Sequence, residues 1–371
     1  MNLADLETPR LLLDTGRMEA NVKRLKSHLA SLGVRLRPHV KTCKSIEVAR
    51  TFMESPAGPI TVSTLKEAEQ FIAHGVKDIL YAVGIAPGKL AHVERLRAKG
   101  IDLCVVVDNV DAAAAVAACE SGIPALIEID SDGHRAGVKP GSLLLVDIAK
   151  ALSRGGECRG VMAHAGASYD CRSTAAIADM AEQERRAVVD SAQVLREAGF
   201  PAPVVSVGST PTATFARSLD GVTEVRAGVF VFQDLVMAGL GVCAVDDIAV
   251  SVLATVIGHQ PERGWVITDA GWMALSRDRG TAKQPVDQGY GLVCDESGRA
   301  LTDVIVHQAN QEHGIVTGRN GKPLDVAKFP VGTRLRVLPN HACATVAQHD
   351  GYDLVRGNTQ VQGRWQRFNG W

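Results

Sequence analysis

The hydrophobic positions of the chain follow two different patterns, and the change between them falls near residue 240. From about residue 10 to residue 235, short apolar runs alternate with amphipathic stretches in which apolar residues recur at helical spacing, as Val22, Leu25 and Leu29 do. About eight such strand–helix pairs with short turns are typical of parallel strands wrapped by helices. Their number and total length predict a (β/α)8 barrel, with a doubly wound open sheet as the alternative.

The open-sheet alternative lacks its usual dinucleotide signature, because no predicted strand is followed by a G-x-G-x-x-G turn. After residue 240, apolar runs are joined by loops without a long helix, which predicts an antiparallel β domain. We therefore expect a barrel over residues 10–238 and a mostly β domain formed by residues 1–9 and 239–371. Because the chemistry of such a barrel lies at the carboxyl ends of its strands, the polar residues that follow each apolar run are the candidates for it.

Composition narrows the class of protein without identifying a reaction. The 371 residues are 46% hydrophobic and 22% charged, and the formal net charge is −1. This balance argues against a nucleic-acid partner, since such proteins usually carry a basic surplus. No apolar run reaches 18 residues and the N-terminus lacks the layout of a signal peptide, so we expect a cytoplasmic protein without membrane contact. The eight cysteines show no C-x-x-C or disulfide-like spacing, and we expect free thiols.

The segment RPHVKTCKS, residues 37–45, follows an alternating apolar run at a place where a barrel strand should end. His39 and Lys41 would then share one face of the strand. A lysine that is desolvated in a barrel mouth loses its proton more easily, which prepares it to form a Schiff base with a carbonyl compound. The alternative interpretation is that Lys41 and Lys44 are solvated loop lysines.

Polar residues also follow the last predicted strands of the barrel. In PVVSVGSTPT, residues 203–212, Gly208, Ser209 and Thr210 offer backbone N–H groups and hydroxyls suited to a phosphate, or else a plain turn with a helix N-cap. Gly228 ends the next strand, and barrels often bind phosphate with the loops after their last two strands. Other strand ends carry Arg135, His164 and Tyr169. A candidate Schiff-base lysine together with a phosphate site suggests pyridoxal phosphate.

The segment PNHACATVAQHD, residues 339–350, predicts a strand of the β domain. In an extended strand His341 and Cys343 point to one side, where an imidazole nitrogen and a thiolate are suitable ligands for zinc. A buried cysteine beside a chance histidine is the plainer interpretation, and two ligands do not complete a metal site.

One ordered set of motifs resembles the D-serine dehydratase and D-threonine aldolase family, whose barrel is of the alanine racemase type (fold type III). The motifs are TPRLLLD, RPHVKTCKS, ITVSTLKEAEQF, IEIDSDGHRAGV, VSVGSTPT, TDAG, NQEHG and PNHACATVAQHD, and the resemblance runs from Thr8 to Trp371. It implies a lyase that depends on pyridoxal phosphate and a metal ion. It also implies a homodimer.

The resemblance further implies roles for single residues. Lys41 would bind the cofactor covalently and, once released, act as the general base, while Arg135 would face the pyridine nitrogen. The phosphate would be held by Gly208, Ser209, Thr210 and Gly228, and the remaining cofactor contacts would come from His39, His164 and Tyr169. His341 and Cys343 would hold zinc, with manganese or magnesium as alternatives. Zinc would assist loss of the 3-hydroxyl from a D-3-hydroxy amino acid such as D-threo-3-hydroxyaspartate or D-serine.

Three other activities stay open. The resemblance leaves a retro-aldol reaction open, but aldolases of that family more often carry an aspartate where this chain has Cys343. A carboxylate suits manganese or magnesium and a thiolate suits zinc, so Cys343 favours dehydration. A non-catalytic barrel that binds the cofactor would not need the β domain. A racemase would need a second acid–base residue, and Tyr290 and Tyr352 are the only tyrosines in the β domain. Arg277 and His313 could contact an acidic substrate, and His349 could support the metal pair.

Overall fold

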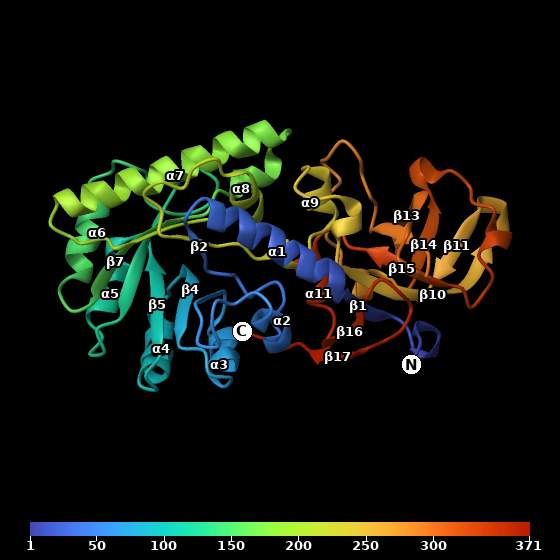
Figure 1. The fold of residues 1–371 in the computed structure, drawn as a ribbon, viewed down its shortest axis with the longest axis horizontal. Coiled ribbons are helices and arrows are strands. Elements are labelled where there is room, and N and C mark those ends of the chain that lie inside the picture. The colour runs from blue at the N-terminus through green and yellow to red at the C-terminus, as the bar shows by residue number, and fades with distance from the viewer. The chain divides into compact units, whose positions relative to one another are not determined.

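The computed structural model describes residues 1–371, and the chain divides into two compact units (Figure 1). The barrel unit comprises residues 24–228 and 370–371, and the β unit comprises residues 1–23 and 229–369. The first boundary thus lies later than residue 10, and the second lies earlier than residue 238, which were the boundaries expected from the sequence. Helix α1 (Thr15–Ser31) continues from the β unit into the barrel unit.

Eight parallel strands form the sheet of the barrel unit. They are β2 (Arg35–Leu36), β3 (Ile60–Val62), β4 (Asp78–Gly84), β5 (Asp102–Val107), β6 (Pro124–Ile129), β7 (Glu157–Ala163), β8 (Val204–Val207) and β9 (Glu224–Val225). Their order is β2-β9-β8-β7-β6-β5-β4-β3, and a parallel bridge between His39 and Thr61 joins the two ends of the sheet. The sheet therefore closes on itself, and the predicted (β/α)8 barrel is confirmed.

Helices connect these strands and cover the outside of the barrel. They are α2 (Ile46–Arg50), α3 (Leu65–Ile72), α4 (Leu90–Arg97), α5 (Val110–Ala117), α6 (Leu144–Leu152), α7 (Thr174–Glu197) and α8 (Thr210–Phe215). Helix α3 illustrates why they form: Thr64 accepts the N–H of Glu67 as N-cap, and Leu65, Ala68 and Phe71 form the buried face. All six residues of β6 are buried, as expected for a parallel strand covered on both sides.

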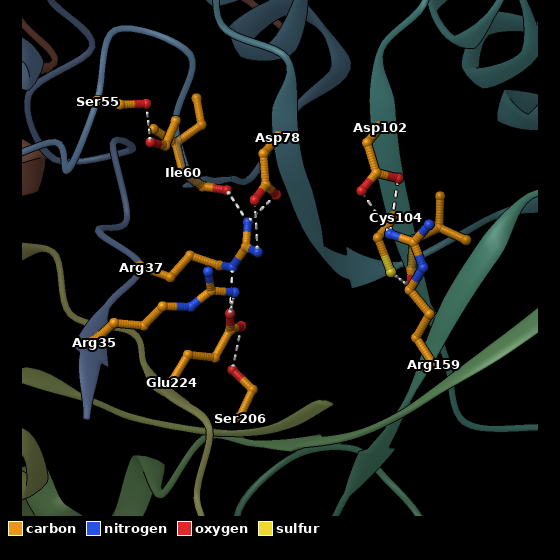
Figure 2. A network of polar contacts seen from close by, with 12 residues as sticks. Arg35, Arg37, Ser55, Ile60, Asp78, Asp102, Cys104, Arg159, Ser206 and Glu224 are labelled. Carbon is orange, nitrogen blue, oxygen red and sulfur yellow. Dashed lines mark hydrogen bonds and ion pairs between the residues drawn. The ribbon is translucent and has the colours of Figure 1, made fainter. Parts of the chain in front are cut away.

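Charged side chains occupy part of the barrel interior, where apolar layers are usual. Figure 2 shows Arg37, which is 8% exposed, between two carboxylates: its Nε lies 2.7 Å from Glu224 Oε2 and its Nη1 lies 2.6 Å from Asp78 Oδ1. Ser206 donates to Glu224 Oε1 at 2.9 Å. Burial alone would raise the pKa of Glu224, but the charge of Arg37 outweighs burial and the pKa is lowered. This network joins residues of β4, β8 and β9 to the segment after β2.

The β unit is built on a nine-stranded sheet. Its strands are β1 (Arg10–Asp14), β10 (Val250–Gln260), β11 (Trp265–Thr268), β12 (Leu292–Cys294), β13 (Ala300–Ala309), β14 (Gly314–Gly318), β15 (Arg334–Leu338), β16 (Gly351–Val355) and β17 (Gly363–Gln366). Their order is β11-β14-β13-β12-β15-β10-β1-β16-β17, and an added β10–β11 pairing closes six of them into a small barrel. The predicted β domain is confirmed.

Strand β1 does not begin the (β/α)8 barrel, contrary to expectation. It pairs antiparallel with β10 and parallel with β16, and Leu12 packs in a core with Leu3, Leu253 and Val355. Its apolar run is therefore buried by partners that lie more than two hundred residues further along the chain.

Three short helices complete the β unit: α9 (Leu235–Gly239), α10 (Trp272–Leu275) and α11 (Ala342–Val346). The strand predicted for residues 339–350 is therefore wrong, because α11 occupies its centre. Alanine favours helix, and the first amide of α11 finds a partner outside the helix: Ala342 N–H donates to Asp234 Oδ2 at 2.9 Å.

All eight cysteines are free thiols in the structure, as expected. None of its helices combines the length and the apolar character that a membrane-spanning helix requires.

Candidate functional site

Cationic and imidazole side chains gather where β2, β7 and β9 end. His39 lies within electrostatic range of Lys41, Arg226 and His164. His164 in turn lies within range of Lys41, Arg135 and Arg226. The structure therefore brings together Lys41, His39, Arg135 and His164, which the sequence singled out separately, and adds Arg226.

Both histidines of this cluster are neutral at pH 7. Burial, reinforced by Lys41 and Arg226, holds the pKa of His39 well below its ordinary value. Burial also lowers the pKa of His164 to about 4. His164 Nδ1 lies 2.9 Å from the carbonyl oxygen of Gly208, which can only accept, so Nδ1 carries the hydrogen and Nε2 is left as an acceptor.

Lys41 lies in a turn, not on a strand. Strand β2 ends at Leu36, although backbone pairing continues to Val40: His39 N–H donates to the carbonyl oxygen of Ala227 at 2.8 Å and Val40 N–H donates to that of Thr61 at 2.9 Å. The chain then turns over residues 40–43. The side chain of Lys41 is exposed, so the packing of this chain does not provide the desolvation that the sequence predicted. The backbone N–H of Lys41 donates to His39 Nδ1 at 3.4 Å.

The loop between β8 and α8 differs in part from the predicted phosphate cradle. Gly208 has a φ of +140°, and a Cβ there would lie 1.9 Å from the carbonyl oxygen of Arg226, so only glycine fits. Its N–H donates to Glu184 Oε1 at 3.0 Å, and the N–H of Ser209 donates to Thr212 Oγ1 at 3.1 Å. These two amides are thus already bonded, and Ser209 is the N-cap of α8, which was the alternative interpretation.

Gly228 brings the end of β9 against the turn that carries Lys41. A Cβ on Gly228 would lie 3.0 Å from both the carbonyl oxygen of His39 and Thr42 Oγ1. The parts of the predicted cradle that could still hold a phosphate are the hydroxyl groups of Ser209 and Thr210 and the loop at Gly228.

Two residues of this region escaped the sequence analysis. Arg226, 4% exposed, donates from Nη1 to Ser206 Oγ at 2.5 Å and from Nη2 to the carbonyl oxygen of Ala163. Glu184, 1% exposed, accepts the N–H groups of Ala165 and Gly208 and so ties the ends of β7 and β8 together. An arginine within the apolar run EVRAGVF was a usable signal for Arg226. Glu184 stands in a charged helical stretch and gave none.

Arg135 and Tyr169 lie on the loops after β6 and β7. Arg135 Nη2 is 3.4 Å from Glu128 Oε1, and 59% of the Arg135 side chain is exposed. Tyr169 belongs to a 3-10 turn, Gly166–Asp170, and its ring centroid lies 6.4 Å from that of His164. The structure thus places Tyr169 beside the neutral histidine, as a shared site requires.

In the β unit, His341 and Cys343 lie at the start of α11. His341 is the N-cap of this helix, and its Nδ1 lies 2.8 Å from Asp278 Oδ2. Burial alone would lower the pKa of His341, but hydrogen bonds with Asp278 and Cys343 raise it to about 11. The imidazole and the thiol are therefore in contact, although the helix rather than a strand brings them together.

This arrangement has the donor chemistry of a metal site. Metal-binding histidines usually donate their second ring N–H to a carboxylate, as His341 does to Asp278, so a metal would take the place of the proton on Nε2. An imidazole nitrogen and a thiolate suit zinc. No group of three or more His, Cys, Asp and Glu side chains is arranged around a common metal position. The candidate ligands remain His341 and Cys343, the two that the family resemblance implies. Asp278 was missed, although it stands beside Arg277 in SRDRG.

Asp234 fixes the start of α11. Its Oδ2 accepts the N–H of Ala342 and its Oδ1 accepts the N–H of Met237, both at 2.9 Å, so one carboxylate caps α9 and α11. The sequence offered no sign of this role, because the two helices lie about one hundred residues apart.

The other polar residues of the β unit have local partners. The Arg277 guanidinium lies over the Trp272 ring, 5.2 Å from its centroid. His313 lies in the turn between β13 and β14, where its carbonyl oxygen accepts the N–H of Asn310 at 2.8 Å. His349 Nε2 lies 3.0 Å from the carbonyl oxygen of Ala274, and burial lowers the pKa of His349.

Two known domain families match successive parts of the chain. Residues 13–235 match the family described as "Alanine racemase, N-terminal domain", and residues 249–355 match the "Putative serine dehydratase domain". Over its full length the chain is 54% identical to D-threo-3-hydroxyaspartate dehydratase from Delftia sp. (strain HT23), covering 99% of that protein. The chain belongs to the D-serine dehydratase and D-threonine aldolase family.

Other members of this family cover the same length. D-serine dehydratase from Dictyostelium discoideum is 30% identical and matches 100% of the chain and 98% of that protein. D-threonine aldolase from Arthrobacter sp is also 30% identical and matches 98% of the chain and 93% of that protein. The solved structure of the Delftia enzyme superposes with a TM-score of 0.97 at 52% identity, covering 100% of both chains. Dehydratases and aldolases of this kind are lyases, so the predicted fold, family and enzyme class are confirmed.

Proposed function

We propose that this protein is a dehydratase that eliminates water from a D-3-hydroxy amino acid, using pyridoxal phosphate and zinc. D-threo-3-hydroxyaspartate would give oxaloacetate and ammonia, and D-serine would give pyruvate and ammonia. The observation that carries the proposal is the 54% identity with the Delftia dehydratase over the whole chain. The residues of the two units fit this chemistry.

The barrel unit has groups that fit pyridoxal phosphate. Lys41 would hold the cofactor covalently, and the phosphate would be held by Ser209, Thr210 and Gly228. The Gly228 position supports this fit, because a side chain there would fill the space between the β9 loop and the Lys41 turn. When bound, the cofactor withdraws electrons from Cα of the amino acid and so makes its proton acidic.

The barrel unit offers a candidate base and a candidate hydrogen-bond acceptor for this reaction. Lys41 Nζ would remove the α-proton, and the unprotonated Nε2 of neutral His164 would accept a hydrogen bond from substrate or cofactor. Arg135 would face the ring nitrogen, and Arg226 is the more buried cation beside the same histidines. An arginine keeps its own proton, so the ring would draw electrons less strongly and the leaving hydroxyl would need separate assistance.

That assistance would come from zinc held by His341 Nε2 and the Cys343 thiolate. Bound there, zinc would supply Lewis acidity that stabilises the negative charge developing on the departing hydroxyl oxygen. Two similar solved structures of D-threo-3-hydroxyaspartate dehydratase are a histidine-to-alanine mutant and a cysteine-to-alanine mutant, the latter in the metal-free form. An imidazole and a thiolate favour zinc over manganese or magnesium. The enamine left after elimination tautomerises and hydrolyses to a 2-oxo acid and ammonia.

Metal removal tests this assignment. The purified enzyme, loaded with pyridoxal phosphate, is treated with a chelator, and oxaloacetate release is followed before and after zinc is returned. We expect activity to disappear and to return with zinc, while the visible absorbance of the bound cofactor stays in place throughout. A chelated, metal-free enzyme that keeps full activity would contradict the role of His341 and Cys343.

We also propose that the protein is a homodimer, as the family resemblance implies. Light scattering on the purified chain would give twice the mass of 39.4 kDa. A monomeric mass with full activity would exclude the dimer as a requirement for catalysis.

A further inference from the structure

The turn that carries Lys41 ends on a lysine with an unusual backbone conformation. Lys44 has a φ of +41°, in the left-handed region that glycine and asparagine adopt far more readily than lysine. Its side chain is only 15% exposed, and its Nζ lies 3.2 Å from Glu67 Oε1. Backbone preference does not explain a lysine at this position, whereas the ion pair with Glu67 does.

Glu67 is a buried carboxylate for which the reaction described above has no use. Only 1% of Glu67 is exposed, and it stands at the third position of α3. Its Oε2 accepts the N–H of Ser63 at 2.8 Å, and Ser63 Oγ lies 3.5 Å from His39 Nε2. Burial raises the pKa of Glu67, and the amide of Ser63 and the charges of Lys44 and Lys41 oppose this rise. Glu67 therefore lies within electrostatic range of Lys41.

Both ends of the Lys41 turn are tied to the segment that contains β3 and α3. Before Lys41, Val40 N–H donates to the carbonyl oxygen of Thr61 at 2.9 Å. After it, Lys44 N–H donates to the carbonyl oxygen of Val40 at 2.8 Å, and the Lys44 side chain reaches Glu67. Lys41 itself is exposed, so its backbone rather than its own packing fixes where Nζ can reach.

We propose that Lys44 and Glu67 are positioning residues for Lys41: their buried ion pair fixes the turn from which Lys41 holds the cofactor and moves the α-proton. This inference rests on the proposed function, in which Lys41 has both tasks. A small displacement of a reacting group is costly, and a shift of about 1 Å can slow a reaction by about a hundredfold. Loss of the pair should therefore lower kcat and loosen the cofactor, with little effect on KM.

The test compares variants of the complete enzyme loaded with pyridoxal phosphate and zinc. Glu67→Gln keeps the shape of the side chain and removes its charge. Lys44→Gly combined with Glu67→Gln removes both charges and places glycine where φ is positive, so the pair is lost without leaving a buried charge unpaired. Lys44→Arg keeps a cation within reach of Glu67. The matched control is Glu69→Gln on the same helix, a partly exposed carboxylate whose partners Lys66 Nζ and His92 Nε2 lie 3.4 Å and 2.9 Å away.

For Glu67→Gln and for the double variant, we expect kcat to fall about ten- to a hundredfold, KM to change less than about twofold and the cofactor absorbance to decay faster on dilution. Lys44→Arg should keep most of the wild-type kcat, and Glu69→Gln should behave as wild type. A double variant with wild-type kcat and wild-type cofactor retention would overturn the proposal. If wild type forms no oxo acid, the proposed function fails, and the rate of cofactor loss from the variants still decides whether the pair positions Lys41.

Discussion

At the scale of single residues, the neutral histidines near Lys41 make the stability of the folded protein depend on pH. The pKa of His164 is about 4 because the ring is buried, against an ordinary value of about 6.5. Between these two pH values the unfolded chain binds a proton that the folded chain does not. The free energy of unfolding therefore falls as the pH drops through this window, by at most about 1.4 kcal/mol per pH unit.

The substitution His164→Asn should remove this part of the acid sensitivity. Thermal unfolding of the cofactor-free protein would be followed between pH 7 and pH 4. We expect the midpoint of wild type to fall more steeply over this range than that of the variant. Parallel pH profiles for the two proteins would mean that His164 is protonated in the folded state as readily as in the unfolded chain.

Gly208 is the residue at which a single methyl group should matter most. A Cβ would meet the backbone of Arg226 at 1.9 Å, so Gly208→Ala should lower the free energy of unfolding by more than about 2 kcal/mol. Gly88 has open space around the corresponding position and serves as the control. Denaturant unfolding of both variants measures the difference. Equal stability of Gly208→Ala and Gly88→Ala would contradict the close approach of β8 and β9.

Residues with rare chemistry could be found in the sequence, and their supporting partners could not. Lys41, His341 and Cys343 stand in short motifs with recognisable spacing. Asp278 lies 63 residues before His341, and Glu184 lies 24 residues before Gly208, so no local pattern connects either carboxylate to its partner. Carboxylates in charged stretches also predict surface positions, whereas Glu184 is buried.

At the scale of elements, α11 shows how a distant carboxylate decides a local structure. Asp234 supplies the acceptor for the first amide of α11 and also caps α9. The apolar pattern of residues 339–350 suits a strand or a short helix, and the sequence analysis chose the strand because this external acceptor is invisible in sequence. The strand predicted to reach Lys41 also stops short, because its backbone pairing ends at Val40, where the turn begins.

Asp234→Ala should therefore disturb the metal pair without touching it. Loss of a helix-capping acceptor lowers the free energy of unfolding by about 1–2 kcal/mol, and this substitution removes the acceptor from the first turns of both α9 and α11. We expect a lower thermal midpoint and a lower zinc content after dialysis, measured by metal analysis. Asp325→Ala removes a similar cap from an exposed 3-10 turn of the same unit and should leave the zinc content unchanged. A fully metal-loaded Asp234→Ala protein would contradict the anchoring role.

At the scale of the whole molecule, each unit holds its own set of candidate site residues. The alternation of strands and helices was enough to predict the barrel, since its strands pair with their neighbours in the chain except where β2 pairs with β9. It was not enough to place β1, because Leu12 pairs with Ser251 and Asp353. Pairing between segments so far apart leaves no periodic signal, so the boundaries near residues 10 and 238 could not be refined from sequence.

This division predicts that metal removal has a local effect on amide hydrogen exchange. Chelation of the enzyme should increase exchange in residues 272–280 and 339–347, which surround Asp278, His341 and Cys343. Strands β5 and β6 of the barrel unit should exchange as before. An equal increase in both units would show that the metal stabilises the protein as a whole.

The most direct test of the central claim is the identity of the products formed from D-threo-3-hydroxyaspartate. The purified enzyme, supplied with pyridoxal phosphate and zinc, would be mixed with this substrate and the products followed by NMR and an ammonia assay. The account predicts oxaloacetate and ammonia in equal amounts, as elimination of water requires. Glyoxylate and glycine would mean that the Cα–Cβ bond breaks. The assignment of a dehydratase, which rests on Cys343 and on the similarity to the Delftia enzyme, would then be wrong.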